Sequence, residues 1–246
     1  MKNNNMLSTI FRYSKRIQYR TEKLLEFLDF FARPQKKQQI IDRFHNLYYD
    51  SHTQEKTWHD TYFFGIPVQK CPLDLHIFQD IIHDVKPDVI IETGTAGGGS
   101  AYYMACLCDF LGKGKIVTID IIKWPNLPKH KRINYIFGSS VDAKILEKIQ
   151  KHIRKNDTIL VVLDSNHTAD YVLKELRAYN KFVTRGSYII VEDTNVNGHP
   201  VYKEHGPGPM EALIAFKKTN KQFTSDRSRE KYLFTFNPEG YLKKTR

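Results

Sequence analysis

The stretch Asp88-Val-Ile-Ile-Glu-Thr-Gly-Thr-Ala-Gly-Gly-Gly-Ser100 decides the fold that this chain is expected to adopt. A short apolar run ends in the acid Glu92, glycines follow, and a helical pattern then runs from Ser100 to Phe110. This order is typical of a buried parallel strand that turns into a helix, with glycines that let a ligand approach the backbone closely. Open α/β sheets bind ligands at the carboxyl ends of their strands. We therefore predict a ligand site directly after Glu92.

The carboxylate of Glu92 indicates which ligand is bound there. It would repel a pyrophosphate, but it can face a cation, and S-adenosylmethionine (SAM) carries both an ammonium and a sulfonium. Two alternatives stay open. Gly94, Ala96 and Gly99 fit a loose dinucleotide fingerprint, which is weak alone, and the turn could also bind nothing. A second acid, Asp120, ends the next strand-like run and could hold ribose hydroxyls in either kind of nucleotide fold.

From Val85 onward, predicted strands and helices alternate. Strands are expected near 87–92, 115–120, 133–137, 158–163 and 187–192, and helices near 99–111, 141–155, 168–181 and 208–219. This rhythm predicts an α/β fold with a doubly wound, mostly parallel sheet. Phe223–Ser225 and Tyr232–Phe236 lack an intervening helix. We expect them to add an antiparallel hairpin at the sheet edge, which gives seven strands.

Residues 1–57 are predicted to be a helical N-terminal appendage to the α/β domain at 58–246. A second helix is expected over Lys36–Tyr48, after a first helix that Pro34 ends. The first helix has apolar residues at helical spacing, namely Leu7, Ile10, Phe11, Ile17, Leu24, Leu25, Leu28 and Phe31. This stripe could pack on its own domain or on a partner subunit of a homo-oligomer. Because basic residues surround it, it could also lie on a membrane surface. Residues 58–84 bridge to the core through an aromatic segment and a helix over Leu73–Asp84.

The composition excludes several classes of protein. The 246 residues, 41% of them hydrophobic, can bury one sizeable core. There is no run of eighteen apolar residues and no signal-peptide pattern, and three cysteines give neither a disulfide framework nor a zinc spacing. We expect a cytoplasmic protein, which could work at the inner face of the membrane. The net charge of +11 fits a solvated surface, an anionic substrate or an anionic membrane. No zinc finger, RNP-like pattern or polybasic tract indicates nucleic acid.

Three further acids follow predicted strands. Asp164 ends the fourth strand, and Glu192 and Asp193 end the fifth. Neighbouring parallel strands would bring these carboxylates together, where they repel one another unless a cation neutralises them. Oxygen ligands favour Mg²⁺, Mn²⁺ or Ca²⁺ over zinc. Glu192 and Asp193 would face opposite sides of a regular strand, so shared chelation requires the chain to bend there. A purely polar site is the alternative.

Two features near these acids could take part in catalysis or in substrate binding. His167 could be a general base, a metal ligand or a residue that orients the loop. The segment between Thr194 and Gly208 is a long loop, and such loops are commonly lids or binding loops. His199, Tyr202 and His205 are its candidate substrate contacts, although the loop could also be a mere connection.

Together, these residues resemble the cephalosporin hydroxylase family, whose members include bacterial rhamnosyl and other sugar O-methyltransferases. The resemblance covers roughly residues 58–242. It depends on five motifs, which are specific only in combination: Pro87-Asp-Val-Ile-Ile-Glu-Thr-Gly-Thr95, Leu163-Asp-Ser-Asn-His167, Val191-Glu-Asp-Thr-Asn195, Gly206-Pro-Gly-Pro-Met210, and Asp226-Arg-Ser-Arg-Glu-Lys231 before Phe236-Asn-Pro238.

The resemblance implies a class I SAM-dependent methyltransferase fold with a divalent metal, most simply Mg²⁺ or Mn²⁺. The family's metal acids correspond to Asp164, Glu192 and Asp193. Its cofactor positions correspond to Glu92, Gly94, Ser100 and Asp120, with Thr95 and Ala96 in the same loop and Ser139 and Ser140 near the adenine. No iron-ligand pattern for hydroxylation is present.

The leading hypothesis is a metal-dependent O-methyltransferase that acts on a hydroxyl of a nucleotide-linked, lipid-linked or polymer-borne sugar. Asp164 would help to bind the metal beside the acceptor oxygen, and His167 would take the proton. The runner-up substrate is a polyketide, a β-lactam-type compound or another small metabolite. A non-catalytic cofactor-binding or membrane-associated protein is the alternative from a different class.

Overall fold

The computed structural model describes residues 3–51 and 57–246, and the chain divides into two compact units, Met1–Phe44 and His45–Arg246. The smaller unit contains helix α1 (Asn3–Ala32) and most of α2 (Pro34–Asp50), with Pro34 at the first position of α2. Both predicted helices are therefore confirmed. The apolar positions Leu7, Ile10, Phe11 and Phe31 lie outside the described side chains. Within the described residues, no helix has both the length and the hydropathy to span a membrane.

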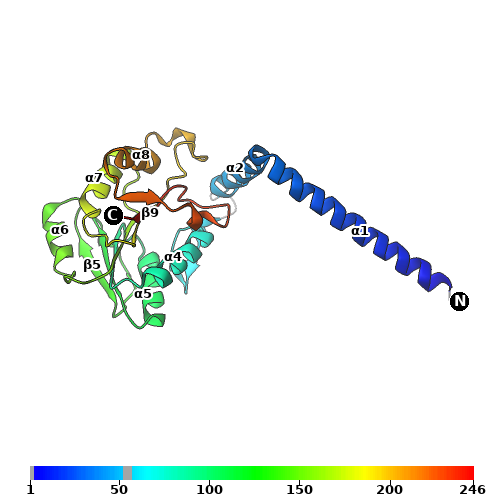
Figure 1. Cartoon of the computed structure of the whole chain (residues 1–246). Helices are drawn as coiled ribbons and strands as arrows, with labels where there is room; N and C mark the ends of the chain where they lie inside the picture. Colours follow the sequence, from blue (N-terminus) through cyan, green and yellow to red (C-terminus); the bar gives the residue numbers. More distant parts are fainter. Residues whose placement is uncertain (1–2, 52–56) are drawn as a thin grey trace. The chain divides into compact units, whose positions relative to one another are not determined.

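A seven-stranded sheet forms the centre of the larger unit (Figure 1). Its order is β5-β4-β3-β6-β7-β9-β8. The first strand of this sheet in the sequence, β3, is therefore central, with β4 and β5 on one side and the later strands on the other. The five predicted parallel strands are confirmed as β3 (Val89–Thr93), β4 (Lys115–Asp120), β5 (Ile133–Phe137), β6 (Ile159–Leu163) and β7 (Tyr188–Val191). Their carboxyl ends lie at one edge, because β3 pairs in parallel with both β4 and β6.

Helices cover both faces of this sheet, because alternate strand residues point to opposite sides. Val89 and Ile91 pack with α6 (Ala143–Gln150), α7 (Ala169–Tyr179) and α8 (Pro209–Thr219). Ile90 packs on the other side with α4 (Pro72–Val85) and α5 (Gly99–Phe110). All five residues of β3 are buried, which is why its sequence is a continuous apolar run ending in Glu92 and Thr93.

The C-terminal hairpin is present, but its second strand was predicted at the wrong place. β8 (Phe223–Ser225) pairs with β9 (Tyr241–Lys244), which also pairs antiparallel with β7. Tyr232–Phe236 is not a strand. It follows a short 3-10 helix, η3 (Arg227–Glu230), and Leu233 has a φ of +68°, which breaks an extended conformation. Of the alternating aromatic residues that imitate a strand, Phe234 and Phe236 pack in a separate aromatic cluster, and Tyr232 packs against the core beside α4 and α5.

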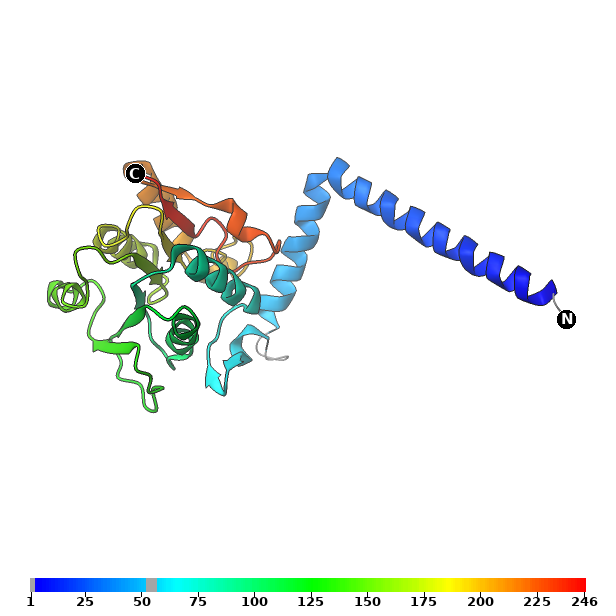
Figure 2. The same cartoon turned by 60° about the horizontal axis from the view of Figure 1, so that its bottom comes forward.

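That aromatic cluster connects the start of the larger unit to its C-terminal part. Phe234 and Phe236 pack around Cys71 with Tyr48, Tyr49 and Trp58. Trp58 begins the 3-10 helix η1 (Trp58–Asp60), which precedes the hairpin of β1 (Tyr62–Phe63) and β2 (Ile66–Pro67), drawn in cyan in Figure 2. The cluster therefore fixes the segment that enters the core beside the carboxyl edge of the sheet.

Candidate functional site

The glycine loop after β3 lies directly against the end of β6. Gly94 has a φ of +87°, and a Cβ atom there would lie 1.8 Å from the backbone oxygen of Asp164. At Gly99, the first residue of α5, a Cβ would lie 2.1 Å from the backbone oxygen of Pro67. Only glycine permits these two approaches. The loop thus brings the cofactor motif and the first candidate metal acid into direct contact.

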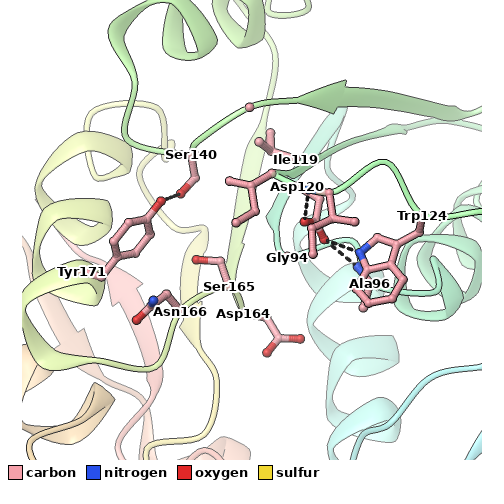
Figure 3. Close-up of a pocket in the computed structure, with 13 residues that line it drawn as sticks. Gly94, Ala96, Ile119, Asp120, Trp124, Ser140, Asp164, Ser165, Asn166 and Tyr171 are labelled. Atoms are coloured by element: carbon pink, nitrogen blue, oxygen red, sulfur yellow. Dashed lines mark hydrogen bonds between the residues drawn. The ribbon is translucent and has the colours of Figure 1, made fainter.

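Asp120 ties the glycine loop to the segment that follows β4. Its Oδ2 atom accepts hydrogen bonds from the backbone N–H of Ala96 (3.0 Å) and from Nε1 of Trp124 (3.2 Å) (Figure 3). It also accepts one from the backbone N–H of Thr95 (3.1 Å). Asp120, Ala96 and Trp124 border a cavity of about 350 Å³, which we call the cofactor cavity. Gly94, Asp120, Trp124 and Ser140 are among its lining residues.

Hydroxyl groups form the opposite wall of the cofactor cavity. The Tyr171 hydroxyl lies 2.9 Å from Ser139 Oγ and 3.1 Å from Ser140 Oγ, and Ser140 also donates to Glu175 (2.6 Å). Figure 3 shows Tyr171 and Ser140 facing Asp120 across the cavity. Ser140 and Tyr171 line it, so this wall could hold the adenine part of a nucleoside. Ser139 and Ser140 were predicted to lie near the adenine, whereas Tyr171 and Glu175 were not predicted.

Glu92 lies beneath the glycine loop and lines neither of the cavities described here. Its carboxylate accepts hydrogen bonds from Ser100 Oγ (2.5 Å) and Thr118 Oγ1 (2.6 Å), and it is fully buried. Burial raises the pKa of Glu92 to about 7, although the two hydroxyls oppose this shift. Glu92 thus fixes the hydroxyl of Ser100, which itself lines a second cavity.

Asp164, His167 and Asp193 converge at the carboxyl ends of β6 and β7. One potential ligand atom from each lies within 4.8 Å of the others. The Nε2 atom of His167 lies 3.8 Å from Asp164 Oδ1 and 3.6 Å from Asp193 Oδ2. The bend that shared chelation requires is present, because the strand ends at Val191 and Asp193 has a φ of +55°. Burial raises the pKa of Asp193, and the charge on Asp164 adds to this.

A buried lysine occupies the other side of Asp164. Lys70 precedes α4, and its Nζ atom lies 2.5 Å from Asp164 Oδ2 and 3.1 Å from Glu192 Oε2. Burial opposes the charge of Lys70, but the two carboxylates outweigh it and raise the pKa of the ammonium. Burial also raises the pKa of Glu192, whose Oε1 atom has no hydrogen-bond partner in the described part of the chain. Glu192 is thus close to the three converging residues but is held by Lys70.

Asp164 also lines a second cavity, of about 370 Å³, which we call the acceptor cavity. It shares Gly94, Ala96, Asp164 and Ser165 with the cofactor cavity. His167, Asp193, Tyr202 and His205 also line it, together with Tyr49 and Trp58. The loop after β7 is ordered around a short 3-10 helix, η2 (Lys203–His205). His199 does not line the cavity, because its Nε2 atom pairs with Glu211 Oε1 at 2.8 Å.

Several lining or supporting residues were not predictable from the sequence. Lys70 gave no signal, because a lysine before Cys71-Pro72 is usually exposed and its partners are distant in the sequence. Tyr49 and Tyr171 resemble ordinary packing aromatics. Trp124 offered a weak signal, since it follows Asp120 by four residues in a turn-rich segment at the predicted ligand edge.

Comparisons with known proteins show similarity in sequence and in fold. The model of the Rhamnosyl O-methyltransferase/CmcI family matches residues 55–245. The Rhamnosyl O-methyltransferase of Mycobacterium tuberculosis strain H37Rv is 34% identical over 212 residues, which is 82% of this chain and 84% of that protein. The Mycobacterium leprae protein of the same name is 32% identical over 211 residues, covering 82% and 90%.

Two solved structures of CmcI have the same fold. An apo structure superposes with a TM-score of 0.59 at 19% identity, covering 76% of this chain and 77% of the other. A structure of CmcI with Mg and SAM superposes with a TM-score of 0.57 at 18% identity, covering 76% and 78%. The likeness confirms the predicted class I methyltransferase-like architecture, with its antiparallel C-terminal strands.

Proposed function

The chain belongs to the Rhamnosyl O-methyltransferase/CmcI family and is a SAM-dependent O-methyltransferase, and on that premise we propose that it methylates a hydroxyl of a glycan or glycolipid sugar with the help of a divalent cation. One observation carries the proposal. The cofactor cavity and the acceptor cavity meet at Gly94, Asp164 and Ser165. A methyl donor in the first cavity and a hydroxyl in the second would therefore meet beside Asp164, and such positioning supplies much of a transfer rate.

The lining residues of the cofactor cavity suit SAM. Asp120 would exchange the N–H donors of Thr95, Ala96 and Trp124 in part for ribose hydroxyls. Ser140 and Tyr171 would contact the adenine, with Ser139 behind them. Gly94 would lie under the methionine part, close to the reacting methyl group, because it borders both cavities.

The donor set beside the acceptor cavity fits a hard divalent cation, most simply Mg²⁺ or Mn²⁺. Asp164 and Asp193 would hold it, and Glu192, with its unpartnered and buried Oε1 atom, would supply a third carboxylate. When bound, such a cation lowers the pKa of a coordinated hydroxyl and stabilises its anion. Lys70 would keep Asp164 and Glu192 oriented through the ion pairs at 2.5 and 3.1 Å.

His167 is the proposed general base. Its Nε2 atom lies 3.6–3.8 Å from carboxylate oxygens of Asp193 and Asp164 at the wall of the acceptor cavity. An imidazole there can accept the acceptor's proton and be stabilised as a cation by both aspartates. Tyr202 and His205 would contact the sugar, whereas the pairing of His199 with Glu211 gives it a role in fixing the loop.

The helical N-terminal region supports a separate proposal, peripheral contact with an anionic membrane. Ile17, Leu24, Leu25 and Leu28 are each more than half exposed along α1. Basic residues lie in the part of the helix before Leu24, namely Arg12, Lys15, Arg16 and Arg20. A helix of this kind can lie in a membrane interface, where a lipid-linked acceptor would be found. A second copy of the chain is the alternative occupant of this face.

A labelled-methyl assay tests the function. Purified protein is incubated with labelled SAM and panels of sugars, catechols and small metabolites, with and without excess chelator. We expect label in sugars, loss with chelator, and recovery with Mg²⁺ or Mn²⁺. Asp193→Asn should weaken Mn²⁺ binding in calorimetry, and His167→Gln should abolish transfer while leaving Mn²⁺ binding nearly unchanged. Label only in catechols, or full activity in chelator, would refute the sugar or the metal part respectively.

A further inference from the structure

The acceptor cavity has an aromatic wall built from three separate segments. Tyr49 comes from the end of α2, Trp58 from η1, and Tyr202 from the loop before η2. We infer that this wall binds the apolar face of the acceptor sugar by stacking, and that the sugar ring enters the cavity without a phosphate or carboxylate beside it. This inference rests on the proposed function and narrows its substrate class.

The wall is fixed before any acceptor binds. The rings of Tyr49 and Trp58 are stacked, with centroids 5.3 Å apart and an interplanar angle of 21°. The indole Nε1 atom of Trp58 donates a hydrogen bond to the backbone oxygen of Tyr49 at 3.1 Å. Phe236 packs edge-on against both rings, at 5.6 and 6.0 Å. Rigid aromatic side chains offer large contact areas at a small entropic cost, and the C–H groups on one face of a pyranose ring complement them.

The charges around the cavity oppose an anionic group. Asp164 and Asp193 line it together with the titratable residues His167 and His205, and no lysine or arginine is among its described lining residues. The nearest buried cation, Lys70, is already paired with Asp164 and Glu192. Even a divalent cation would only offset the two aspartates. A phosphate placed here would therefore lack a counter-charge.

Neutral sugars at the end of a glycan or glycolipid meet two conditions: they offer an apolar ring face for stacking, and they carry no anionic group beside the ring. A nucleotide-diphosphate sugar satisfies only the first, because its diphosphate begins at the anomeric carbon and would lie close to the carboxylates. The neutral terminal sugar is thus the acceptor class that the cavity fits, and the nucleotide-linked sugar becomes the outcome that the experiment must exclude.

The two tryptophans of the chain allow a direct test, because Trp58 lines the acceptor cavity and Trp124 lines the cofactor cavity. In a Trp124→Phe variant, Trp58 alone reports acceptor binding. This variant, with Mn²⁺ and S-adenosylhomocysteine bound, is titrated with a neutral methyl rhamnoside and, separately, with the nucleoside-diphosphate derivative of the same sugar. We expect a saturable change in Trp58 emission with the glycoside, and binding of the nucleotide sugar at least about tenfold weaker.

Kinetics of the otherwise native enzyme complete the test. Trp58→Ala and Tyr202→Ala should each raise KM for the glycoside by about tenfold and change kcat much less. Tyr202 is half exposed, so its removal does not endanger folding, and Trp58→Phe should restore most of the affinity. Phe64→Ala is the matched control, because Phe64 is 87% exposed and lines neither cavity.

The outcomes separate the inference from the function on which it rests. Methyl transfer to sugars with a preference for the nucleotide-linked form, or with an unchanged KM in both alanine variants, overturns the inference and leaves the sugar function standing. Absence of both binding and transfer with every sugar overturns the proposed function together with it.

Discussion

The Nζ atom of Lys70 lies 2.5 Å from Oδ2 of Asp164, and the same ammonium lies 3.1 Å from Glu192. One buried cation thus joins the ends of two neighbouring strands, β6 and β7. Without it, the carboxylates of Asp164 and Glu192 would repel each other away from bulk water, so the positive charge of Lys70 stabilises the acidic site.

Lys70→Met is therefore expected to destabilise the protein by about 3–5 kcal/mol, because it leaves buried carboxylates without a counter-charge. Urea unfolding near neutral pH measures the effect. Lys113→Met is the matched control. Lys113 pairs with Asp88 at 2.7 Å but is 43% exposed, so its loss should cost less than about 1 kcal/mol. Equal losses in the two variants would show that the burial of Lys70 carries no special weight.

Gly94 gives a prediction that separates backbone strain from steric overlap. Gly94→Ala places a methyl group 1.8 Å from the Asp164 backbone oxygen, whereas at Gly112, with a φ of +70°, an added Cβ would have nothing within 4 Å. Both variants carry the cost of a left-handed residue, about 1–2 kcal/mol. Only Gly94→Ala should lose clearly more than this and also lose SAM binding in calorimetry. Similar unfolding curves for both would mean that the loop moves freely away from β6.

The buried carboxyl group of Asp74 should make the stability of the protein depend on pH. It is buried and accepts hydrogen bonds from Thr235 Oγ1 (2.5 Å), Tyr241 OH (2.9 Å) and the Phe236 N–H (2.8 Å). Burial raises its pKa from 3.8 to about 6, despite these bonds. The folded state therefore binds the proton more tightly than the unfolded chain does. The resulting stabilisation is complete below about pH 4 and is lost as the pH rises through about 6, which amounts to roughly 3 kcal/mol.

Asp74→Asn cannot ionise, so it should lack this pH dependence. Its free energy of unfolding should be lower than that of the wild type at low pH, because the amide cannot accept all three bonds. The difference between the two proteins should shrink as the pH rises toward 7. Parallel stability curves over this range would contradict the assignment.

The sheet was predictable from local sequence because each parallel strand is a short apolar run that ends in turn or acidic residues. The strand prediction for Tyr232–Phe236 was wrong because it also used only local sequence, and the alternating aromatic residues of this segment fit a strand pattern. What decides its structure is tertiary, namely the φ of Leu233, the packing of Phe234 and Phe236 around Cys71, and the bonds of Thr235 and Phe236 to Asp74.

The convergence of Asp164 and Asp193 at one edge follows from parallel strand ends, and the sequence was sufficient to predict it. The role of Lys70 was not predictable, because it depends on partners 94 and 122 positions away that only the folded chain brings within reach. The same limit applies to Tyr49 and Trp58, whose place in the cavity wall depends on the aromatic cluster.

Removal of residues 1–32 tests the proposed membrane contact while leaving α2 in place. We expect full-length protein to sediment with vesicles that contain anionic phospholipid, and the shortened protein to remain in solution. Transfer to a short water-soluble acceptor should be unchanged. Full-length Ile17→Glu with Leu24→Glu should behave like the truncation. If the full-length protein instead forms dimers that this double variant dissociates, the apolar face of α1 serves a second copy of the chain.

The wall shared by the two cavities has a thermodynamic consequence. Because Gly94, Ala96, Asp164 and Ser165 border both, a ligand in one cavity rests on atoms that help to shape the other. The two binding equilibria are then linked, and linkage is reciprocal. If bound SAM changes the affinity for the acceptor by some factor, bound acceptor changes the affinity for SAM by the same factor. Calorimetric titrations in both orders measure the two factors. Their common value gives the free energy by which this enzyme favours the ternary complex over either half-filled state.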